Sequence, residues 1–169
     1  MISRVKKIVE DAVIPKKAHR DDTGYDLWII NKGKERENGV VMYGTGLAVE
    51  PPTGWYFEIV PRSSIIKTGY IQANGVGVVD TGYRGELFVP LKKIDEASPD
   101  IELPKKIAQL VLRPINTCDF IEVDSLCDTE RGEGGFGSTD DTNKEDTYWE
   151  CRDRVSSEGV KIFGGRTNE

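Results

Sequence analysis

The chain consists of short apolar segments, several rich in β-branched or aromatic residues, which glycine and proline separate from one another. This pattern is typical of strands joined by tight turns rather than of long helices. It predicts strands at Asp26–Ile30, Val40–Glu50, Trp55–Val60, Val76–Asp80, Glu86–Leu91, Ile107–Leu112 and Phe120–Val123. Seven short strands of this kind predict an all-β fold, either a sandwich or a barrel.

Other segments show how the chain is organised. Ser63–Thr68 predicts a short helical turn ending at Gly69, and the charged stretch Asn31–Asn38 is typical of a solvated loop. After residue 127 the composition changes to glycine, serine, threonine and aspartate. We therefore expect a β domain over residues 1–127 and a flexible, weakly packed C-terminal arm over residues 128–169. The evident apolar anchors of this arm are Tyr148, Trp149, Ile162 and Phe163.

Length and charge limit the possible functions. The 169 residues suit one ordinary domain, and no apolar run is long enough to span a bilayer. The first ten residues lack the apolar stretch of a secretory signal, so we expect a cytoplasmic or nuclear protein. A formal net charge of −6 argues against nonspecific binding of nucleic acid, so an anionic ligand would need a local group of cations.

Cysteine and histidine are too few for several kinds of site. Cys118, Cys127 and Cys151 show no C-x-x-C spacing, so neither a disulfide framework nor a structural zinc site is predicted. His19 is the only histidine, which excludes most histidine-based nucleophilic triads. Carboxylates are therefore the expected general bases.

The segment Pro61-Arg62-Ser63-Ser64 brings an arginine and two hydroxyls to the start of the predicted helical turn. Free backbone amides at such a position favour an anion, for example a phosphate. An ordinary helix N-cap beside an exposed arginine is the alternative interpretation.

The segment Asn74–Glu86 contains four glycines around a predicted strand end. Glycines beside a strand often mark close approach of the backbone to a ligand, and free N–H and C=O groups of a hairpin can pair with a planar amide such as a nucleobase edge. Asp80 would act as a general base on water or supply hydrogen bonds to a turn. Tyr83 would close against a ring or pack in the core.

Two further segments have an ordinary and a functional interpretation. Gln109 lies within an apolar run, where a polar residue either faces solvent or is held inward. Arg131–Thr139 combines an arginine, four glycines, Phe136 and two hydroxyls. A flexible linker is the default for such a sequence, but these groups also suit a lid that closes over a phosphorylated aromatic ligand.

Taken in order, five segments of the chain resemble the five motifs of the homotrimeric deoxyuridine triphosphatase (dUTPase) family. They are Thr23-Gly24-Tyr25-Asp26-Leu27, Pro61-Arg62-Ser63-Ser64, Gly77 to Gly85, Ile107-Ala108-Gln109-Leu110 and Arg131 to Thr139. Each motif alone is weak, but five in sequence are specific, and they cover roughly residues 15–140. The chain departs from the family pattern at Thr23, Ser64 and Lys106, and its extension over residues 140–169 runs past the fifth motif.

The resemblance implies a β jelly roll, or distorted barrel, that forms a homotrimer with shared active sites. It implies Mg²⁺-assisted hydrolysis of dUTP to dUMP and pyrophosphate, which limits uracil in DNA and supplies dUMP for dTMP synthesis. Asp80 would activate the water that attacks the α-phosphate. Mg²⁺ would bind through substrate phosphates and water, without side-chain ligands.

The resemblance also implies a set of site residues. The catalytic residues would be Asp80, Arg62, Ser63, Gln109 and Asp26. The substrate-binding residues would be Ser64, Asn74, Gly77, Val78, Val79, Tyr83, Phe88, Arg131, Phe136, Gly137, Ser138 and Thr139. Asn74 and the hairpin backbone near Phe88 would bind uracil, Tyr83 would pack against deoxyribose, and the fifth motif would close over the uracil and the distal phosphates.

Two alternatives share the fold. A deoxycytidine triphosphate deaminase would need a glutamate and an Ala-His-Arg sequence where this chain has Pro90 and Val76-Gly77-Val78. A catalytically inactive nucleotide-binding regulator would use the long extension to engage a partner. The intact Asp80 and fifth motif argue against this second alternative.

Overall fold

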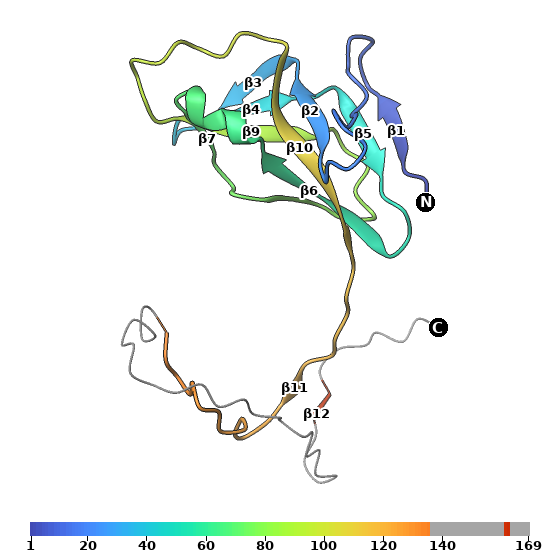
Figure 1. Ribbon diagram of the computed structural model, residues 1–169, viewed down its shortest axis with the longest axis vertical. Coiled ribbons are helices and arrows are strands. Elements are labelled where there is room, and N and C mark those ends of the chain that lie inside the picture. Colours follow the sequence, from blue (N-terminus) through green and yellow to red (C-terminus); the bar gives the residue numbers. More distant parts are fainter. Residues whose placement is uncertain (136–160, 163–169) are drawn as a thin grey trace. The chain divides into compact units, whose positions relative to one another are not determined.

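The computed structural model describes residues 1–135 and the strand at 161–162, and the chain divides into two units, Met1–Asn116 and Thr117–Glu169 (Figure 1). The predicted boundary after residue 127 falls within the second unit. Among the described residues the only helix is a short 3₁₀ helix, η1 (Ser63–Lys67), which directly follows a strand. The prediction of an all-β fold with one short helix is confirmed.

Strands are the main regular structure of the first unit, and every pair of neighbouring strands is antiparallel. One four-stranded sheet has the order β2-β10-β6-β8, a second has the order β3-β4-β9-β7, and β1 pairs with β5. The strands of this unit are β1 (Arg4–Lys7), β2 (Tyr25–Ile29), β3 (Asn31–Glu35), β4 (Val40–Gly44), β5 (Leu47–Glu50), β6 (Trp55–Pro61), β7 (Tyr70–Gln72), β8 (Gly77–Val79), β9 (Phe88–Lys93) and β10 (Lys105–Pro114).

The core lies between the two four-stranded sheets, because alternate residues of their strands turn inward. Phe57 and Ile59 of β6 are buried on the side of one sheet, and Val89 and Leu91 of β9 on the side of the other. All four belong to one apolar cluster, together with residues of β2, β4, β5, β7, β8 and β10. Both sheets therefore share a single core, as a sandwich requires.

The stretch Asn31–Asn38, expected as a solvated loop, instead begins with strand β3. All five residues of β3 are exposed, so no apolar position of the stretch indicated a strand. β3 is the edge of its sheet and pairs only with β4, with an irregularity between Lys32 and Glu35. Charged side chains on an edge strand protect it from pairing with other chains, which explains its polar sequence.

The expected single strand Val40–Glu50 is two strands, β4 and β5, interrupted at Thr45 and Gly46. Gly46 has a φ of 67°, which favours glycine, and the buried Thr45 hydroxyl donates a hydrogen bond of 2.9 Å to the Leu87 carbonyl. The strands β1 and β7 were not predicted. β1 is fully exposed and β7 has only three residues, so neither shows a clear alternation.

The second unit contains a two-stranded antiparallel pair, β11 (Ile121–Glu122) and β12 (Lys161–Ile162), in which Ile121 lies opposite Ile162. The predicted anchors Tyr148, Trp149 and Phe163 lie outside the described residues. Cys118 and Cys127 are free and exposed, and Cys151 also lies outside the described part. No helix of the described residues is long and apolar enough to cross a membrane.

Candidate functional site

Strand β10 brings residues from three distant parts of the sequence together. In its register, Gln109 lies opposite Asp26 of β2 on one side and opposite Val60 of β6 on the other. β6 then ends at Pro61 and the chain continues into Arg62 and Ser63. As a result Asp26, Arg62, Ser63 and Gln109 line one open polar pocket of about 240 Å³, together with Ala18, Asp22, Thr23 and Gly24.

Asp26 holds two cations, Arg62 of this pocket and Lys106 beside it. Its Oδ1 accepts a contact of 2.8 Å from Arg62 Nε and its Oδ2 one of 2.9 Å from Lys106 Nζ. The Asp26 side chain is only 15% exposed, so the pair with Arg62 is partly shielded from solvent. One carboxylate thus faces two cations, so Asp26, Arg62 and Lys106 together keep a net positive charge, while the acidic Asp22 also lines the pocket.

Arg62 stands at the junction of β6 and η1. Its backbone is extended, and its N–H donates a hydrogen bond of 2.9 Å to the Ile107 carbonyl. No side chain caps η1, so the alternative of an ordinary N-cap by a serine hydroxyl does not hold, and Arg62 is an ion-paired side chain rather than a free one. The exposed Ser63 and Ser64 follow directly, with their hydroxyls available to a ligand.

Gly24 is a position of close approach to Gln109. A Cβ on Gly24 would lie 2.7 Å from Gln109 Cδ and would contact Gln109 Oε1 more closely still. Gln109 is half-buried, and its Nε2 donates a long hydrogen bond of 3.3 Å to the Pro61 carbonyl. The absence of a side chain at residue 24 therefore allows the Gln109 amide to stay in the pocket.

A second pocket of about 400 Å³ shares Arg62 with the first and is strongly cationic. Its lining includes Lys67, Lys105 and Lys106 beside Ser64 and the Trp28 ring, and Lys106 Nζ lies 6.0 Å from the centre of that ring. No acidic residue lines this second pocket. Lys67 and Lys105 were not among the predicted site residues, because single lysines before a glycine-containing turn or a strand are common in any sequence.

The glycine-rich segment forms a turn that connects β7 to β8, which belong to different sheets and do not pair, so the expected β-hairpin is not formed; the name hairpin is kept below for this turn together with β8. Asn74 and Gly75 lie in the turn, where Gly75 has a φ of 65°. Gly77 begins β8, and a Cβ there would lie 3.2 Å from both Asn74 Nδ2 and Ile59 Cβ. Along β8, Val78 is 62% exposed, whereas Val79 is 3% exposed in the core. The Val79 side chain is therefore inaccessible to a ligand, and this residue could contact one only through its backbone.

The turn that follows β8 contains the predicted base. Asp80 is exposed, and its carbonyl accepts a hydrogen bond of 3.0 Å from the Tyr83 N–H. The Tyr83 ring is 44% exposed, so it is no core aromatic, and its hydroxyl donates to the Glu86 carbonyl at 2.9 Å. Phe88, 37% exposed, begins β9 two residues before Pro90, whose carbonyl accepts the Ala73 N–H of the hairpin.

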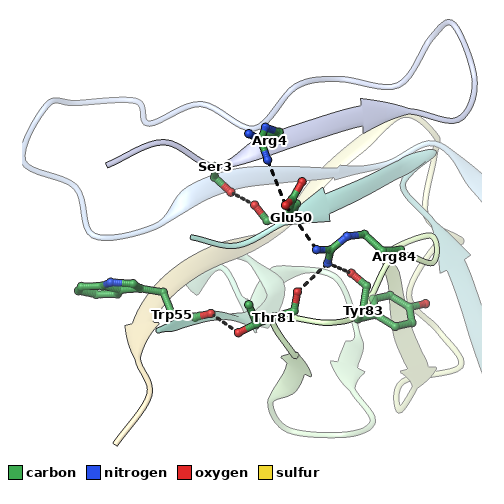
Figure 2. Close-up of polar contacts among 7 residues, drawn as sticks. All are labelled: Ser3, Arg4, Glu50, Trp55, Thr81, Tyr83 and Arg84. Carbon is green, nitrogen blue, oxygen red and sulfur yellow. Dashed lines mark hydrogen bonds and ion pairs between the residues drawn. The ribbon is translucent and has the colours of Figure 1, made fainter. Parts of the chain in front are cut away.

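Figure 2 shows how this turn is held. Arg84 Nη1 donates to the carbonyls of Thr81 at 2.6 Å and Tyr83 at 2.8 Å, while Arg84 Nη2 lies 3.5 Å from Glu50 Oε1. The Thr81 hydroxyl donates a hydrogen bond of 2.7 Å to the Trp55 carbonyl at the start of β6. Glu50 Oε1 also forms an ion pair with Nη1 of Arg4 in β1, at 3.1 Å. One guanidinium thus fixes the turn internally and joins it to β5.

The turn with Asp80 and the polar pocket lie at opposite ends of β6. β8 pairs with β6 so that Val79 lies opposite Phe57, which places Asp80 level with Tyr56. Arg62 is six residues further along, about 20 Å away at roughly 3.3 Å per residue. A triphosphate is much shorter than that. Within one chain, Asp80 therefore does not lie beside Arg62 and Ser63, the predicted phosphate-binding residues of the polar pocket.

The predicted lid is described only in part. Arg131 belongs to the second unit, and its Nε donates a hydrogen bond of 2.9 Å to the Gly134 carbonyl. Phe136, Gly137, Ser138 and Thr139 lie outside the described residues, so their contacts with a base or with phosphates stay predictions.

Known proteins match both the sequence and the fold. A family model described as dUTPase matches residues 10–140. The chain belongs to the dUTPase family. A deoxyuridine 5'-triphosphate nucleotidohydrolase of Clostridioides difficile is 39% identical over 137 residues, which cover 80% of this chain and 96% of that protein. One of Arabidopsis thaliana is 40% identical over 136 residues, covering 80% of this chain and 81% of that protein.

Solved dUTPase structures share the architecture. A mutant of the Staphylococcus bacteriophage 80alpha dUTPase with dUpNHpp has a TM-score of 0.66 and 26% identity, covering 81% of this chain and 97% of that one. A dUTPase of a Staphylococcus aureus phage, phi11, has a TM-score of 0.62 at 23% identity, covering 75% and 98%. The matches to curated relatives cover about four fifths of this dUTPase-family chain. The family model stops at residue 140, so most of the extension lies beyond it.

Proposed function

We propose that the protein hydrolyses dUTP to dUMP and pyrophosphate. The observation that supports this most directly is the polar pocket, in which residues of three separate dUTPase motifs, Asp26, Arg62, Ser63 and Gln109, meet on adjoining strands. The family membership gives no support to the alternatives of a deaminase or an inactive nucleotide-binding regulator.

The phosphate chain binds between Arg62, Ser63, the Ser64 amide and Gln109 in this proposal. Asp26 acts through its ion pairs, since it orients Arg62 and Lys106 without occupying the ligand's place. The adjoining cationic pocket attracts a polyanion toward this end of the chain, although the protein as a whole is acidic. Hydrogen bonds between charged groups and phosphate are the strong ones, so this end supplies much of the affinity.

The base and sugar bind at the hairpin and the turn after β8. Asn74 and the backbone of Gly77 and Val78 face uracil, with Phe88 nearby, and the exposed ring of Tyr83 packs against deoxyribose and leaves no room for a 2′-hydroxyl. A site with fixed donors and acceptors rejects a base with the opposite pattern, because its own polar groups would lose their partners.

Asp80 acts as the general base. Its carboxylate takes a proton from a water molecule whose oxygen forms a bond to the α-phosphorus. The bond from that phosphorus to the oxygen bridging to the β-phosphate breaks, and pyrophosphate leaves with that oxygen. Cations near the phosphates stabilise the charge that develops.

Mg²⁺ enters this proposal as a partner of the triphosphate. Among the described residues, no group of three histidine, cysteine or acidic side chains is placed to hold a metal ion, and both Asp26 oxygens already contact cations. This donor set fits an ion that keeps its waters and binds phosphate oxygens rather than a protein cage. When bound, Mg²⁺ would neutralise phosphate charge.

We further propose that the active site is shared between copies in a homotrimer. The separation of Asp80 from Arg62 along β6 supports this proposal, in which a second copy supplies one of them. The first unit also has an open apolar pocket of about 420 Å³, whose lining includes Tyr25, Phe57 and Leu112. Apolar surface of this kind is typical of an interface.

The decisive test measures pyrophosphate release from dUTP, dCTP, dTTP and UTP with Mg²⁺, together with the mass in solution. We expect strong preference for dUTP and a trimer; hydrolysis without preference for dUTP would refute the proposal. Mixing Asp80→Asn chains with Arg62→Ala chains tests the shared site. Each mixed trimer then has one complete site, so activity should partly return, whereas a site within one chain would give no recovery.

A further inference from the structure

Gln72, the last residue of β7, is a buried amide beside the hairpin turn. It is 8% exposed, and Thr45 is the only other buried polar residue in the part of the chain that the structure describes. The two hydrogens of its Nε2 are shared among three acceptor oxygens: the Ile59 carbonyl at 2.9 Å, Asn74 Oδ1 at 3.1 Å and the Gly75 carbonyl at 3.1 Å. Its own Oε1 is buried without a partner among the described residues.

These contacts determine how both amides are oriented. The Ile59 and Gly75 carbonyls can only accept hydrogen bonds, so the nitrogen of Gln72, and not its oxygen, must face them. The same NH₂ group faces Asn74, so the Asn74 atom at 3.1 Å must be the acceptor Oδ1. Two backbone carbonyls therefore select the Gln72 orientation, and Gln72 in turn selects the Asn74 orientation.

The Asn74 NH₂ group consequently points away from Gln72, toward Gly77. Asn74 Nδ2 lies 3.2 Å from the position that a Cβ would occupy on Gly77. Since Gly77 has no side chain, the space beside this donor stays open. Asn74 itself is exposed, so its NH₂ group is accessible at the mouth of the hairpin.

We propose that Gln72 is a specificity-determining positioning residue, which locks the Asn74 amide so that the hairpin presents an N–H donor to a carbonyl of the base. A pyrimidine with a carbonyl at that place, such as uracil, gains a hydrogen bond. One with an amino group there, such as cytosine, brings a donor against a donor. The inference rests on the proposed function, because it assumes that the base binds at this hairpin.

The unpaired Oε1 distinguishes this role from ordinary packing. A buried acceptor without a partner costs stability, and an apolar side chain of similar size at position 72 would avoid that cost, although it would leave the Ile59 and Gly75 carbonyls without this donor. Gln72 is therefore a poor choice for packing alone, whereas it is the only residue bonded to the Asn74 side chain in the described structure. A packing role and a positioning role thus predict different results for the same substitution.

The experiment compares kcat and KM for dUTP and dCTP in Gln72→Met, in Gln72→Glu and in the control Thr45→Val. Gln72→Met removes the NH₂ group at similar size, so we expect the ratio of kcat/KM for dUTP over dCTP to fall about tenfold, the value of one hydrogen bond. The change should lie mainly in KM. Gln72→Glu offers only acceptors, which attract the Asn74 NH₂ inward, so the ratio should fall further.

Thr45→Val also removes a buried hydroxyl. This hydroxyl hydrogen-bonds to the Leu87 carbonyl and to the Leu47 N–H rather than to the hairpin. The substitution should lower the melting temperature and leave the dUTP to dCTP ratio unchanged. An unchanged ratio in Gln72→Met would overturn the inference, as would an equal fall in the ratio for Thr45→Val.

A measurement on the wild-type protein covers the case in which the Gln72 variants do not fold. In NMR hydrogen exchange, the Gln72 side-chain NH₂ protons should be protected and the Asn74 NH₂ protons should exchange rapidly. Protected Asn74 protons would refute the orientation. Wild-type protein that fails to hydrolyse dUTP would refute the proposed function instead, so the two failures are distinguishable.

Discussion

A methyl group at Gly24 should damage the phosphate-binding pocket far more than the fold. In Gly24→Ala the new Cβ would meet Gln109 Oε1 and would lie 2.7 Å from Cδ and 3.1 Å from Cβ, so the amide must swing out of the pocket. A hydrogen bond from Gln109 to a charged phosphate contributes about 1.5–3 kcal/mol. At about 1.36 kcal/mol per factor of ten, its loss lowers kcat/KM for dUTP by roughly 10- to 100-fold.

The effect on stability should be small because two contributions oppose each other. The displaced Gln109 loses its long hydrogen bond to the Pro61 carbonyl, worth about 0.5–1.5 kcal/mol. Replacing glycine by alanine restricts the unfolded chain and returns about 0.4–1 kcal/mol, since Gly24 is not among the glycines with positive φ. The free energy of unfolding should therefore change by less than about 1 kcal/mol.

A double-mutant cycle shows whether Gly24 acts through Gln109. The assay is steady-state dUTP hydrolysis, with thermal unfolding in parallel, for Gly24→Ala, Gln109→Ala and the double variant. Once the Gln109 amide is gone, the added methyl group has little left to displace, so the double variant should be within about twofold of Gln109→Ala. Losses that multiply in the double variant, or wild-type kcat/KM in Gly24→Ala, would refute the reasoning.

Three further outcomes are expected. Asp80→Asn should lower kcat by about 10²- to 10⁴-fold, the usual contribution of a general base, and retain nucleotide binding by calorimetry; an unchanged kcat would contradict the role of Asp80. Arg84→Met should lower kcat for dUTP several-fold, because it loosens the turn that contains Asp80. Its melting temperature should stay near that of wild type, since exposed ion pairs contribute about 0–1 kcal/mol to stability. A large drop in melting temperature with unchanged kcat would count against this role of Arg84. Burial raises the pKa of Tyr43 from 10.0 to about 12, so its contribution to stability is complete below pH 10 and is lost as the pH rises toward 12. Melting curves across that range should therefore fall more steeply for wild type than for Tyr43→Phe, and parallel curves would contradict this.

The strands with one buried face were predictable because burial leaves an alternating pattern in the sequence. In β6, Phe57 and Ile59 turn inward between partly exposed neighbours, and the strand was predicted within one residue of its observed end. The exposed strand β3 has no inward residue, so its backbone pairing with β4 leaves no trace in the pattern. Strand pairing depends on hydrogen bonds that every sequence can make, whereas the pattern reports only on burial.

The candidate site was predictable through its motifs but not through its geometry. The motif order indicated Asp26, Arg62, Ser63 and Gln109, and the strand register brings these four together. The role of Gln72 was not predictable, because a single amide after Tyr70-Ile71 is typical of a residue that faces solvent. Its burial follows from the pairing of β7 with β9, which places Gln72 opposite Leu91 of the core.

The distribution of charge explains how an acidic protein can bind a polyanion. The formal net charge of −6 describes the field far from the molecule, where salt screens it over about 8 to 10 Å. Near η1 the ligand instead meets Arg62, Lys67, Lys105 and Lys106, with Asp26 as the acidic partner of two of them. Asp26 reduces the local positive charge, but its ion pairs also fix the positions of Arg62 and Lys106. Affinity for the triphosphate then depends on this local arrangement, so adding salt should weaken binding even though protein and ligand are both anions.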